Sequence, residues 1–305
     1  MDLALSTCWN APRHRDGKEM LQEIQEMGFK TVELGHNLRF SLWPGVRKAV
    51  NEGIVNVCSL HNFCPVPIEV IRPSPNCFEF TSLSPQDRRA AVKATLQTLE
   101  SAAQVGASAV VLHLGSYQRK AQVTEKLIQA WKSRSLFTKK TSSSKITYLL
   151  KRKKAMPLIQ SRLRECLDPI LKKASELKLK LGVEFRSDIE EFPHADDFEW
   201  LFREYAGSPL YYWHDFGHAA LMEMLGVINH HQFLQNQIPH LLGAHLQDFS
   251  PPDNDHLALG EGSLPLDQLL PLLPEKSIAV LELSPKIPRE HLIENLRQWE
   301  KRSFL

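Results

Sequence analysis

Eight short runs of β-branched and apolar residues, each followed by a segment with helical spacing, constrain the fold of this chain most. The runs cover residues 3–9, 30–34, 54–60, 108–114, 178–185, 209–215, 241–246 and 277–283. Amphipathic helices are predicted between them, most clearly over 16–29, 84–106, 161–178 and 288–301. Repeated strand–helix units of this kind predict a parallel sheet with helices packed on its faces.

Eight such units can close on themselves, so we predict one (β/α)8 TIM barrel over residues 1–305. An open doubly wound sheet can be drawn from the same units, and the strand count alone does not choose between the two. No G-x-G-x-x-G follows the first run, which disfavours a dinucleotide-binding sheet. A hydrophobic content of 43% with 24% charged residues is typical of a globular domain with a large core.

The cellular compartment is predicted from the lack of a signal-peptide pattern and of a membrane-spanning stretch. The first twenty residues do not combine a basic start with a long apolar run, and no stretch of about 18 apolar residues occurs. We therefore expect a cytoplasmic protein that makes no contact with a membrane. The five cysteines include no C-x-x-C pair, so we expect reduced thiols rather than disulfides or a thiolate zinc site.

Charge is distributed unevenly along the chain. Residues 117–164 contain 14 Lys or Arg and one acid, a net +13, whereas the rest holds 23 basic and 34 acidic residues, a net −11, which together give +2. The stretch after the fourth strand is too long for an ordinary connection, so we predict a partly helical insertion at 117–157, called here the basic insertion. Three roles stay open for it: a solvated face, a lid whose lysines attract a phosphorylated substrate, or nucleic-acid binding, which the acidic remainder disfavours.

Residues that can bind metal recur near the ends of seven consecutive predicted strands. In a barrel of this type the C-terminal strand ends surround one shared mouth. One such residue alone is more often a hydrogen-bonded cap, but agreement at seven ends is not expected by chance. Among them, the carboxylates of Glu184, Asp215 and Glu282 would repel one another without a cation. These oxygen ligands with the imidazole of His245 suit Mn²⁺, Co²⁺, Mg²⁺ or Zn²⁺. The residues are Glu33, His61, His113, Glu184, Asp215, His245 and Glu282.

Short motifs at these ends resemble the xylose isomerase-like barrel superfamily. This superfamily contains sugar isomerases, ketose 3-epimerases, inosose dehydratases and the endonuclease IV apurinic endonucleases. The resemblance spans nearly the whole chain. The motif pattern is most similar to that of members described as sugar phosphate isomerases/epimerases. The motifs are L-H-N-F (60–63), V-L-H-L-G-S (111–116), G-V-E (182–184), H-D-F-G-H-A (214–219), A-H-L-Q-D (244–248), D-H-L-A-L-G-E-G (255–262) and L-E-L (281–283).

The resemblance implies a role for each matched residue. Glu184, Asp215, His245 and Glu282 would bind one divalent metal, and Glu184 and Glu282 would also act as acid and base. Glu33 and His61 would hold substrate hydroxyls, and His218 would face the substrate or a second ion. These roles predict a metal-dependent isomerase or epimerase that removes a proton next to a carbonyl of a carbohydrate, with or without a phosphate group. A homo-oligomer is compatible with the sequence.

The apurinic endonucleases imply a second hypothesis, a multi-zinc phosphodiesterase with two or three ions. Asn254 departs from their pattern, because an aspartate is expected there, and Asp253 or Asp255 would have to replace it. A barrel that binds ligand without turnover is a third hypothesis. The residues that match their set are His61, His113, Glu184, Asp215, His218, His245, His256 and Glu282.

Several of these residues also have simpler interpretations. His218 could cap a helix that starts near Phe216, since the D-x-x-H motif (215–218) also places Asp215 where an N-cap aspartate would lie. His113 is also consistent with a buried structural histidine. His256 is equally consistent with a surface histidine beside a turn. Arg186 either binds substrate or pairs with Asp188 or Glu190.

Overall fold

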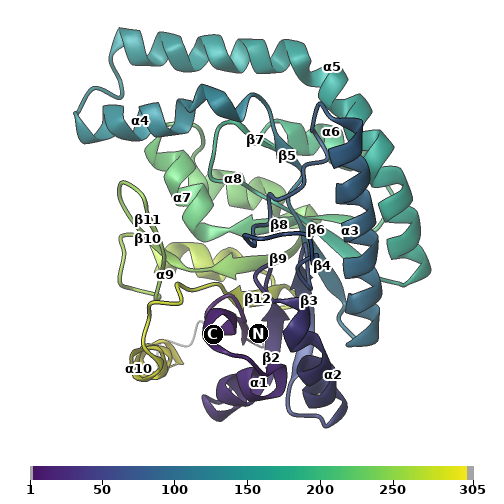
Figure 1. Ribbon diagram of the computed structural model, residues 1–305. Coiled ribbons are helices and arrows are strands. Elements are labelled where there is room, and N and C mark those ends of the chain that lie inside the picture. Colours follow the sequence, from purple (N-terminus) through teal and green to yellow (C-terminus); the bar gives the residue numbers. More distant parts are fainter. Residues whose placement is uncertain (1–2, 301–305) are drawn as a thin grey trace.

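A computed structural model describes residues 3–300 and contains a closed barrel of eight parallel strands (Figure 1). Each of the eight predicted runs coincides with one barrel strand, although β3 extends one residue beyond its run, so the TIM-barrel prediction is confirmed and the open sheet is excluded. The order around the barrel is β1 (Leu3–Ser6), β12 (Ile278–Leu281), β9 (Leu241–Leu246), β8 (Leu210–Asp215), β6 (Lys180–Glu184), β4 (Ala109–Leu112), β3 (Asn56–His61) and β2 (Thr31–Leu34).

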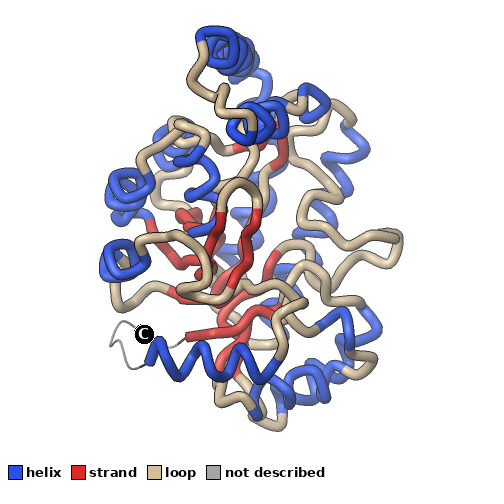
Figure 2. Tube along the Cα trace, turned by 90° about the vertical axis from the view of Figure 1, so that its left-hand side faces the viewer, coloured by secondary structure: helices blue, strands red, loops and turns tan. Residues whose placement is uncertain are grey.

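Helices surround the barrel, as the outer blue coils around the red strands show in Figure 2. The helix predicted over 84–106 begins at Pro85, where Ser84 accepts a hydrogen bond from the amide of Asp87. A serine cap followed by proline is a typical helix start. Two small antiparallel pairs lie outside the barrel: β5 (Gly115–Ser116) with β7 (Glu191–Phe192), and β10 (Asp248–Ser250) with β11 (Asn254–Leu257). The helices are α1 (Gly17–Glu26), α2 (Trp43–Asn51), α3 (Pro85–Gln104), α4 (Val123–Lys132), α5 (Lys139–Glu176), α6 (Asp197–Glu204), α7 (Phe216–Met224), α8 (His230–Gln237), α9 (Leu266–Leu269) and α10 (Arg289–Glu300).

Trp213 occupies the interior of the barrel next to His245. Its side chain is fully buried, and its ring centroid lies 5.2 Å from that of His245. A Cβ atom at Gly182 or Gly243 would lie 2.8 or 2.6 Å from the Trp213 ring. The two glycines on neighbouring strands therefore make room for the indole, which in turn supports the imidazole above it.

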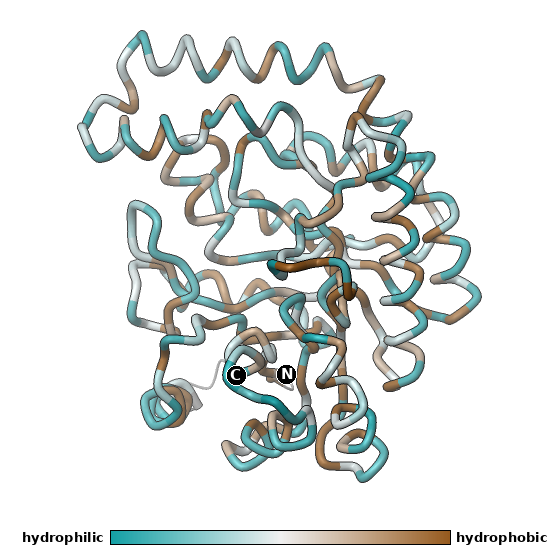
Figure 3. The backbone as a smooth tube through the Cα atoms, in the orientation of Figure 1, coloured by the Kyte–Doolittle hydropathy of each residue, from teal (hydrophilic) through white to brown (hydrophobic). Residues whose placement is uncertain are grey.

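The basic insertion is largely helical. It contains α4 and the first part of α5, a helix of 38 residues that continues into the predicted barrel helix at 161–178. The predicted limit at residue 157 coincides with Pro157, inside α5, and Figure 1 shows α5 changing direction from its crossing above the barrel to its descent along the side. In Figure 3 the outer part of α5 alternates between hydrophilic and hydrophobic positions, and Ile146 and Leu150 there are exposed.

Some basic side chains of the insertion hold it to the rest of the molecule. Arg152 and Asp197, the first residue of α6, form a buried ion pair. Lys145 Nζ donates to the carbonyl oxygens of Leu225 and Gly226, each at 3.0 Å, beyond the end of α7. These residues anchor the insertion, so they are not available as a solvated face.

The described residues include no helix with both the length and the apolar surface that crossing a bilayer requires.

Stability is expected to decrease in acid because of His230. This histidine is buried, and its Nε2 lies 2.9 Å from Nε2 of His214, so at least one of the two nitrogens must be an unprotonated acceptor. Burial and the neighbouring His231 lower the pKa of His230 from 6.5 to about 4. The unfolded chain takes up the proton near pH 6.5 and the folded chain does not, so stability is complete above pH 6.5 and falls as the pH drops towards 4.

The loss attributable to His230 is roughly 3 kcal/mol at pH 4. Urea unfolding of the wild type and of His230→Gln between pH 7.5 and 4 measures it. The variant should show a shallower pH dependence, and equal slopes would contradict the assignment.

Candidate active site

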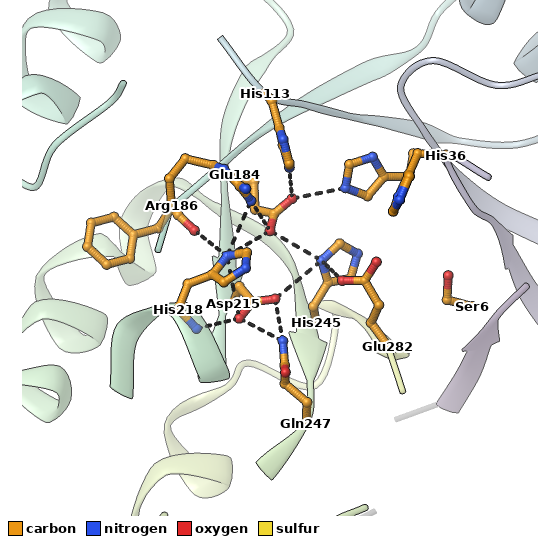
Figure 4. Close-up of polar contacts among 12 residues, drawn as sticks. Ser6, His36, His113, Glu184, Arg186, Asp215, His218, His245, Gln247 and Glu282 are labelled. Carbon is orange, nitrogen blue, oxygen red and sulfur yellow. Dashed lines mark hydrogen bonds and ion pairs between the residues drawn. The ribbon is translucent and has the colours of Figure 1, made fainter. Parts of the chain in front are cut away.

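Four residues from neighbouring strands converge at the C-terminal mouth of the barrel (Figure 4). Glu184 ends β6, Asp215 ends β8, His245 lies near the end of β9 and Glu282 directly follows β12. One ligand atom from each of the four lies within 4.8 Å of the others. All four side chains are at most 6% exposed. The predicted metal-binding residues thus form one buried group.

His245 is oriented so that one ring nitrogen faces the three carboxylates. Its Nε2 lies 3.2 Å from both oxygens of Glu33, which is fully buried on the far edge of the ring. Its Nδ1 lies 3.2 Å from Glu282 and 3.7 Å from both Glu184 and Asp215, yet has no hydrogen-bond partner. Burial lowers the pKa of His245, but Glu282 and Glu33 more than offset this and raise it well above the usual range. The site therefore favours a positive charge at Nδ1, either a proton or a cation.

Asp215 is held in place by two further contacts. Gln247, fully buried, donates from Nε2 to both carboxylate oxygens at 2.9 and 2.8 Å. Asp215 also caps α7 by accepting from the amide of His218 at 2.7 Å, as the simpler interpretation of the D-x-x-H motif predicts. Capping and facing the metal group are therefore compatible roles of one carboxylate. Burial raises the pKa of Asp215, as expected for an anion without enough positive charge around it.

Glu184 is the most highly connected carboxylate of the site. Its Oε2 lies 3.1 Å from Nε2 of His61 and 2.8 Å from Nε2 of His113. Its Oε1 lies 3.0 Å from both Arg186 and His218. Burial alone would raise the pKa of Glu184, but His113, Arg186 and His218 hold it well below the usual range. Glu184 is therefore ionised at neutral pH.

The hydrogen bonds of His61 and His113 place a proton on one nitrogen of each ring. Nδ1 of His61 lies 3.1 Å from the carbonyl oxygen of Asn62, and Nδ1 of His113 lies 2.9 Å from Oδ1 of Asn76. Because these oxygens can only accept, both Nδ1 atoms carry a proton. The ionised Glu184 oxygen also only accepts, so each Nε2 faces it as an N–H donor, or as a lone pair when a cation lies between them. These three residues form a second group able to hold a cation.

The other predicted site residues lie around this centre. Arg186 pairs with Glu184 and Glu191, rather than with Asp188 or Glu190 as the simpler interpretation predicts. Asp215 outweighs burial and raises the pKa of His218 to about 9, so His218 is cationic at neutral pH. Nδ1 of His256 lies 3.0 Å from the carbonyl oxygen of Glu282, and its side chain, 32% exposed, lies at the rim. Among residues 3–300, no group of three or more close ligand atoms includes His218 or His256.

Sequence reasoning missed residues that orient the predicted ligands. Gln247 and Asn76 bind ligand side chains, but neither is a metal-binding residue type. Glycine at position 217 is the one sequence feature linked to Gln247, because a Cβ atom at Gly217 would lie 2.7 Å from the Gln247 side chain. His36 belongs to none of the predicted motifs, yet its ring centroid lies 5.1 Å from that of His61.

Replacing Glu33 with glutamine should weaken metal binding. Glu33 accepts hydrogen bonds from Ser6 and Ser59 as well as facing His245, so the amide loses the charge that orients the imidazole. A loss of about 10- to 100-fold in affinity for Mn²⁺ or Zn²⁺ is expected. Titration with each metal measures it, with Ser59→Ala as a milder control, and unchanged affinity would show that His245 needs no support from Glu33.

Comparison with known proteins found one family model that matches part of the chain and several solved structures with a similar fold. Residues 21–138 match the family model described as xylose isomerase-like TIM barrel. A 3-keto-D-glucoside 4-epimerase, YcjR, from E. coli is similar in structure, with a TM-score of 0.70, 16% identity and 99% of each chain covered. No curated protein sequence matches the chain.

Two further solved structures have the same fold. A D-psicose 3-epimerase with D-tagatose, from Clostridium cellulolyticum H10, has a TM-score of 0.64 and 11% identity over 99% of this chain and 98% of its own. The IOLI protein with a bound zinc atom has a TM-score of 0.65 and 12% identity over 99% of this chain and 97% of its own. At these identities the likeness shows the fold.

Proposed function

We propose that this chain, a closed eight-stranded barrel whose residues 21–138 match the xylose isomerase-like model, is a divalent-metal-dependent isomerase or epimerase acting on a sugar or sugar phosphate. Solved neighbours with this fold include epimerases of a keto-glucoside and of psicose. Both the fold and the residues at the mouth of this barrel support the proposal.

The orientation of His245 carries the proposal. A buried imidazole nitrogen without a hydrogen-bond partner faces three carboxylates, while Glu33 holds the opposite nitrogen. Three oxygen donors and one nitrogen donor suit Mn²⁺, Co²⁺, Mg²⁺ or Zn²⁺. The residues that would hold the ion are Glu184, Asp215, His245 and Glu282.

When bound, a divalent cation would polarise a substrate carbonyl and stabilise the negative charge left when a neighbouring carbon loses a proton. Glu184 and Glu282 supply the two carboxylates, one to remove the proton and the other to return it. Both remain ionised at neutral pH, since neighbouring histidines keep the pKa of each below its usual value despite burial. His218, protonated at neutral pH, can donate a hydrogen bond to a substrate oxygen.

Hydrogen exchange tests this proposal. Protein loaded with Mn²⁺, Co²⁺ or Zn²⁺ is incubated in deuterated water with aldoses, ketoses, 3-keto-glycosides and their phosphates. Deuterium should enter one substrate at the carbon beside the carbonyl, and the isomer should appear by NMR. An isomer formed without label indicates a hydride shift and contradicts proton transfer by a glutamate, while neither label nor isomer in the panel contradicts the proposal.

The convergence of His61 and His113 on Glu184 supports a second candidate, a multi-zinc phosphodiesterase. Two imidazole nitrogens that converge on one carboxylate oxygen would suit another cation beside the first, if they gave up their protons to bind it. A third ion has less support. Asn254 is exposed, and Asp253 pairs with Lys132 at 3.0 Å.

Metal counting with an activity assay separates the two candidates. Two or more Zn²⁺ ions per chain with cleavage of an oligonucleotide containing an abasic site would support the phosphodiesterase. Label exchange into a sugar without such cleavage would support the isomerase.

A further inference from the structure

Strands β1 and β2 contribute no atom to the four-residue metal group, yet the residues just beyond them form another cluster of ligand types. Cys8 and His36 each lie two residues after the end of their strand. One ligand atom each of Cys8, His36 and Glu282 lies within 4.8 Å of the others. In the view of Figure 4, His36 and Ser6 lie on the same side of the site as Glu282.

The barrel register explains why these three residues meet. β1 pairs with β12 on one side, with Leu5 opposite Leu281, and with β2 on the other, with Ser6 opposite Glu33. Residues that follow the three strand ends at similar heights must therefore lie side by side. The parallel register of β6, β8, β9 and β12 brings the predicted metal ligands together in the same way.

Hydrogen bonds hold the two loops against each other. The amide of Gly35 donates to Oγ1 of Thr7 at 2.8 Å, and Asn37 Nδ2 donates to the carbonyl oxygen of Cys8 at 3.1 Å. A Cβ atom at Gly35 would lie 2.3 Å from Sγ of Cys8, so the backbone there leaves space for the thiol. The position of the sulfur is thus fixed by its surroundings.

The distance between the two donor atoms fits a shared ion. Sγ of Cys8 lies 3.5 Å from Nδ1 of His36. Zinc bonds of about 2.3 Å to sulfur and 2.0–2.1 Å to nitrogen place two such donors roughly 3.5 Å apart at a tetrahedral angle. A simple S–H to nitrogen hydrogen bond has a similar length, so an experiment must decide between the two.

We propose that Cys8, His36 and Glu282 form a second, softer metal site that binds a thiophilic divalent cation such as Zn²⁺ or Co²⁺. Glu282 belongs both to this group and to the four-residue group, so one carboxylate would join the two ions. The sulfur ligand distinguishes the new site from the other, whose donors are oxygen and nitrogen only. Three protein ligands leave a fourth position, as in zinc sites that bind water or substrate.

Cobalt absorption tests the proposal without reference to any substrate. Co²⁺ bound by a thiolate absorbs strongly in the near ultraviolet, whereas the four-residue group supplies no sulfur. The wild type titrated with Co²⁺ should develop this absorption, and Cys8→Ser should lose it and bind one equivalent less. His36→Gln should weaken the affinity measured by this absorption by roughly tenfold or more.

Cys77→Ser is the matched control, because Cys77 is a partly exposed thiol outside the cluster. It should keep the absorption unchanged. Absence of the absorption in the wild type, or its persistence in Cys8→Ser, would overturn the second site. The result is independent of the deuterium exchange assay, so failure of the proposed function and failure of this site are distinguishable.

Discussion

Replacing Glu184 with glutamine is expected to lower turnover of the exchanging sugar by roughly 10³-fold. Glu184 belongs both to the four-residue group and to the group formed with His61 and His113, and it also pairs with Arg186. The amide keeps the size of the side chain but removes its charge and its capacity to take a proton. Turnover by NMR and metal content after dialysis should fall together.

Glu199→Gln is the control for this variant, since Glu199 is exposed on α6 and its side chain is 85% accessible. It should leave metal content and turnover unchanged. If Glu184→Gln retained both, the residue would be structural and the site assignment would be wrong.

Removing the carboxylate of Asp197 is expected to destabilise the protein by about 3–5 kcal/mol. Arg152 and Asp197 are 6% and 7% exposed, so Asp197→Ala leaves a buried guanidinium without its anion. Asp197 also accepts from the amide of His194 at 2.6 Å, and that bond is lost as well. The free energy of unfolding in urea measures the effect.

Two further variants separate the buried pair from ordinary surface charge. Glu199→Ala removes an exposed partner of Arg203 on the same helix and should cost less than about 1 kcal/mol. The double variant Arg152→Met with Asp197→Leu should recover much of the loss, because no unpaired charge remains buried. A single-variant loss as small as that of Glu199→Ala would mean that other contacts hold α5 in place.

The eight strands could be predicted because each is a short apolar run bounded by polar or turn residues. Their ends were less certain. The run at 3–9 yields a strand of four residues, and Cys8 lies in the turn beyond it. The full length of α5 was not predicted. Its outer half is rich in exposed lysines and serines, so its apolar residues do not recur with a clear helical period.

The residues at the mouth of the barrel could be predicted from their positions at strand ends. The orientation of their side chains relative to one another could not. The sequence does not show that Glu33 faces the ring of His245. A shift of one residue in the pairing of a strand would turn its side chains to the opposite face of the sheet. Asn76 lies in a long connection, distant in sequence from His113, and nothing local marks it as its partner. The predicted roles of Glu33 and Arg186 towards substrate remain predictions.

Pro157 gives the two parts of α5 different freedom to change in evolution. Proline has no N–H group, so one bond of the helical ladder is already missing where the basic insertion meets the barrel helix. The segment before it is tied down mainly by a few side chains, while Ile159, Leu163 and Leu167 after it are buried in the core. We therefore expect a shortened outer segment to leave the register of the inner helix against the barrel unchanged.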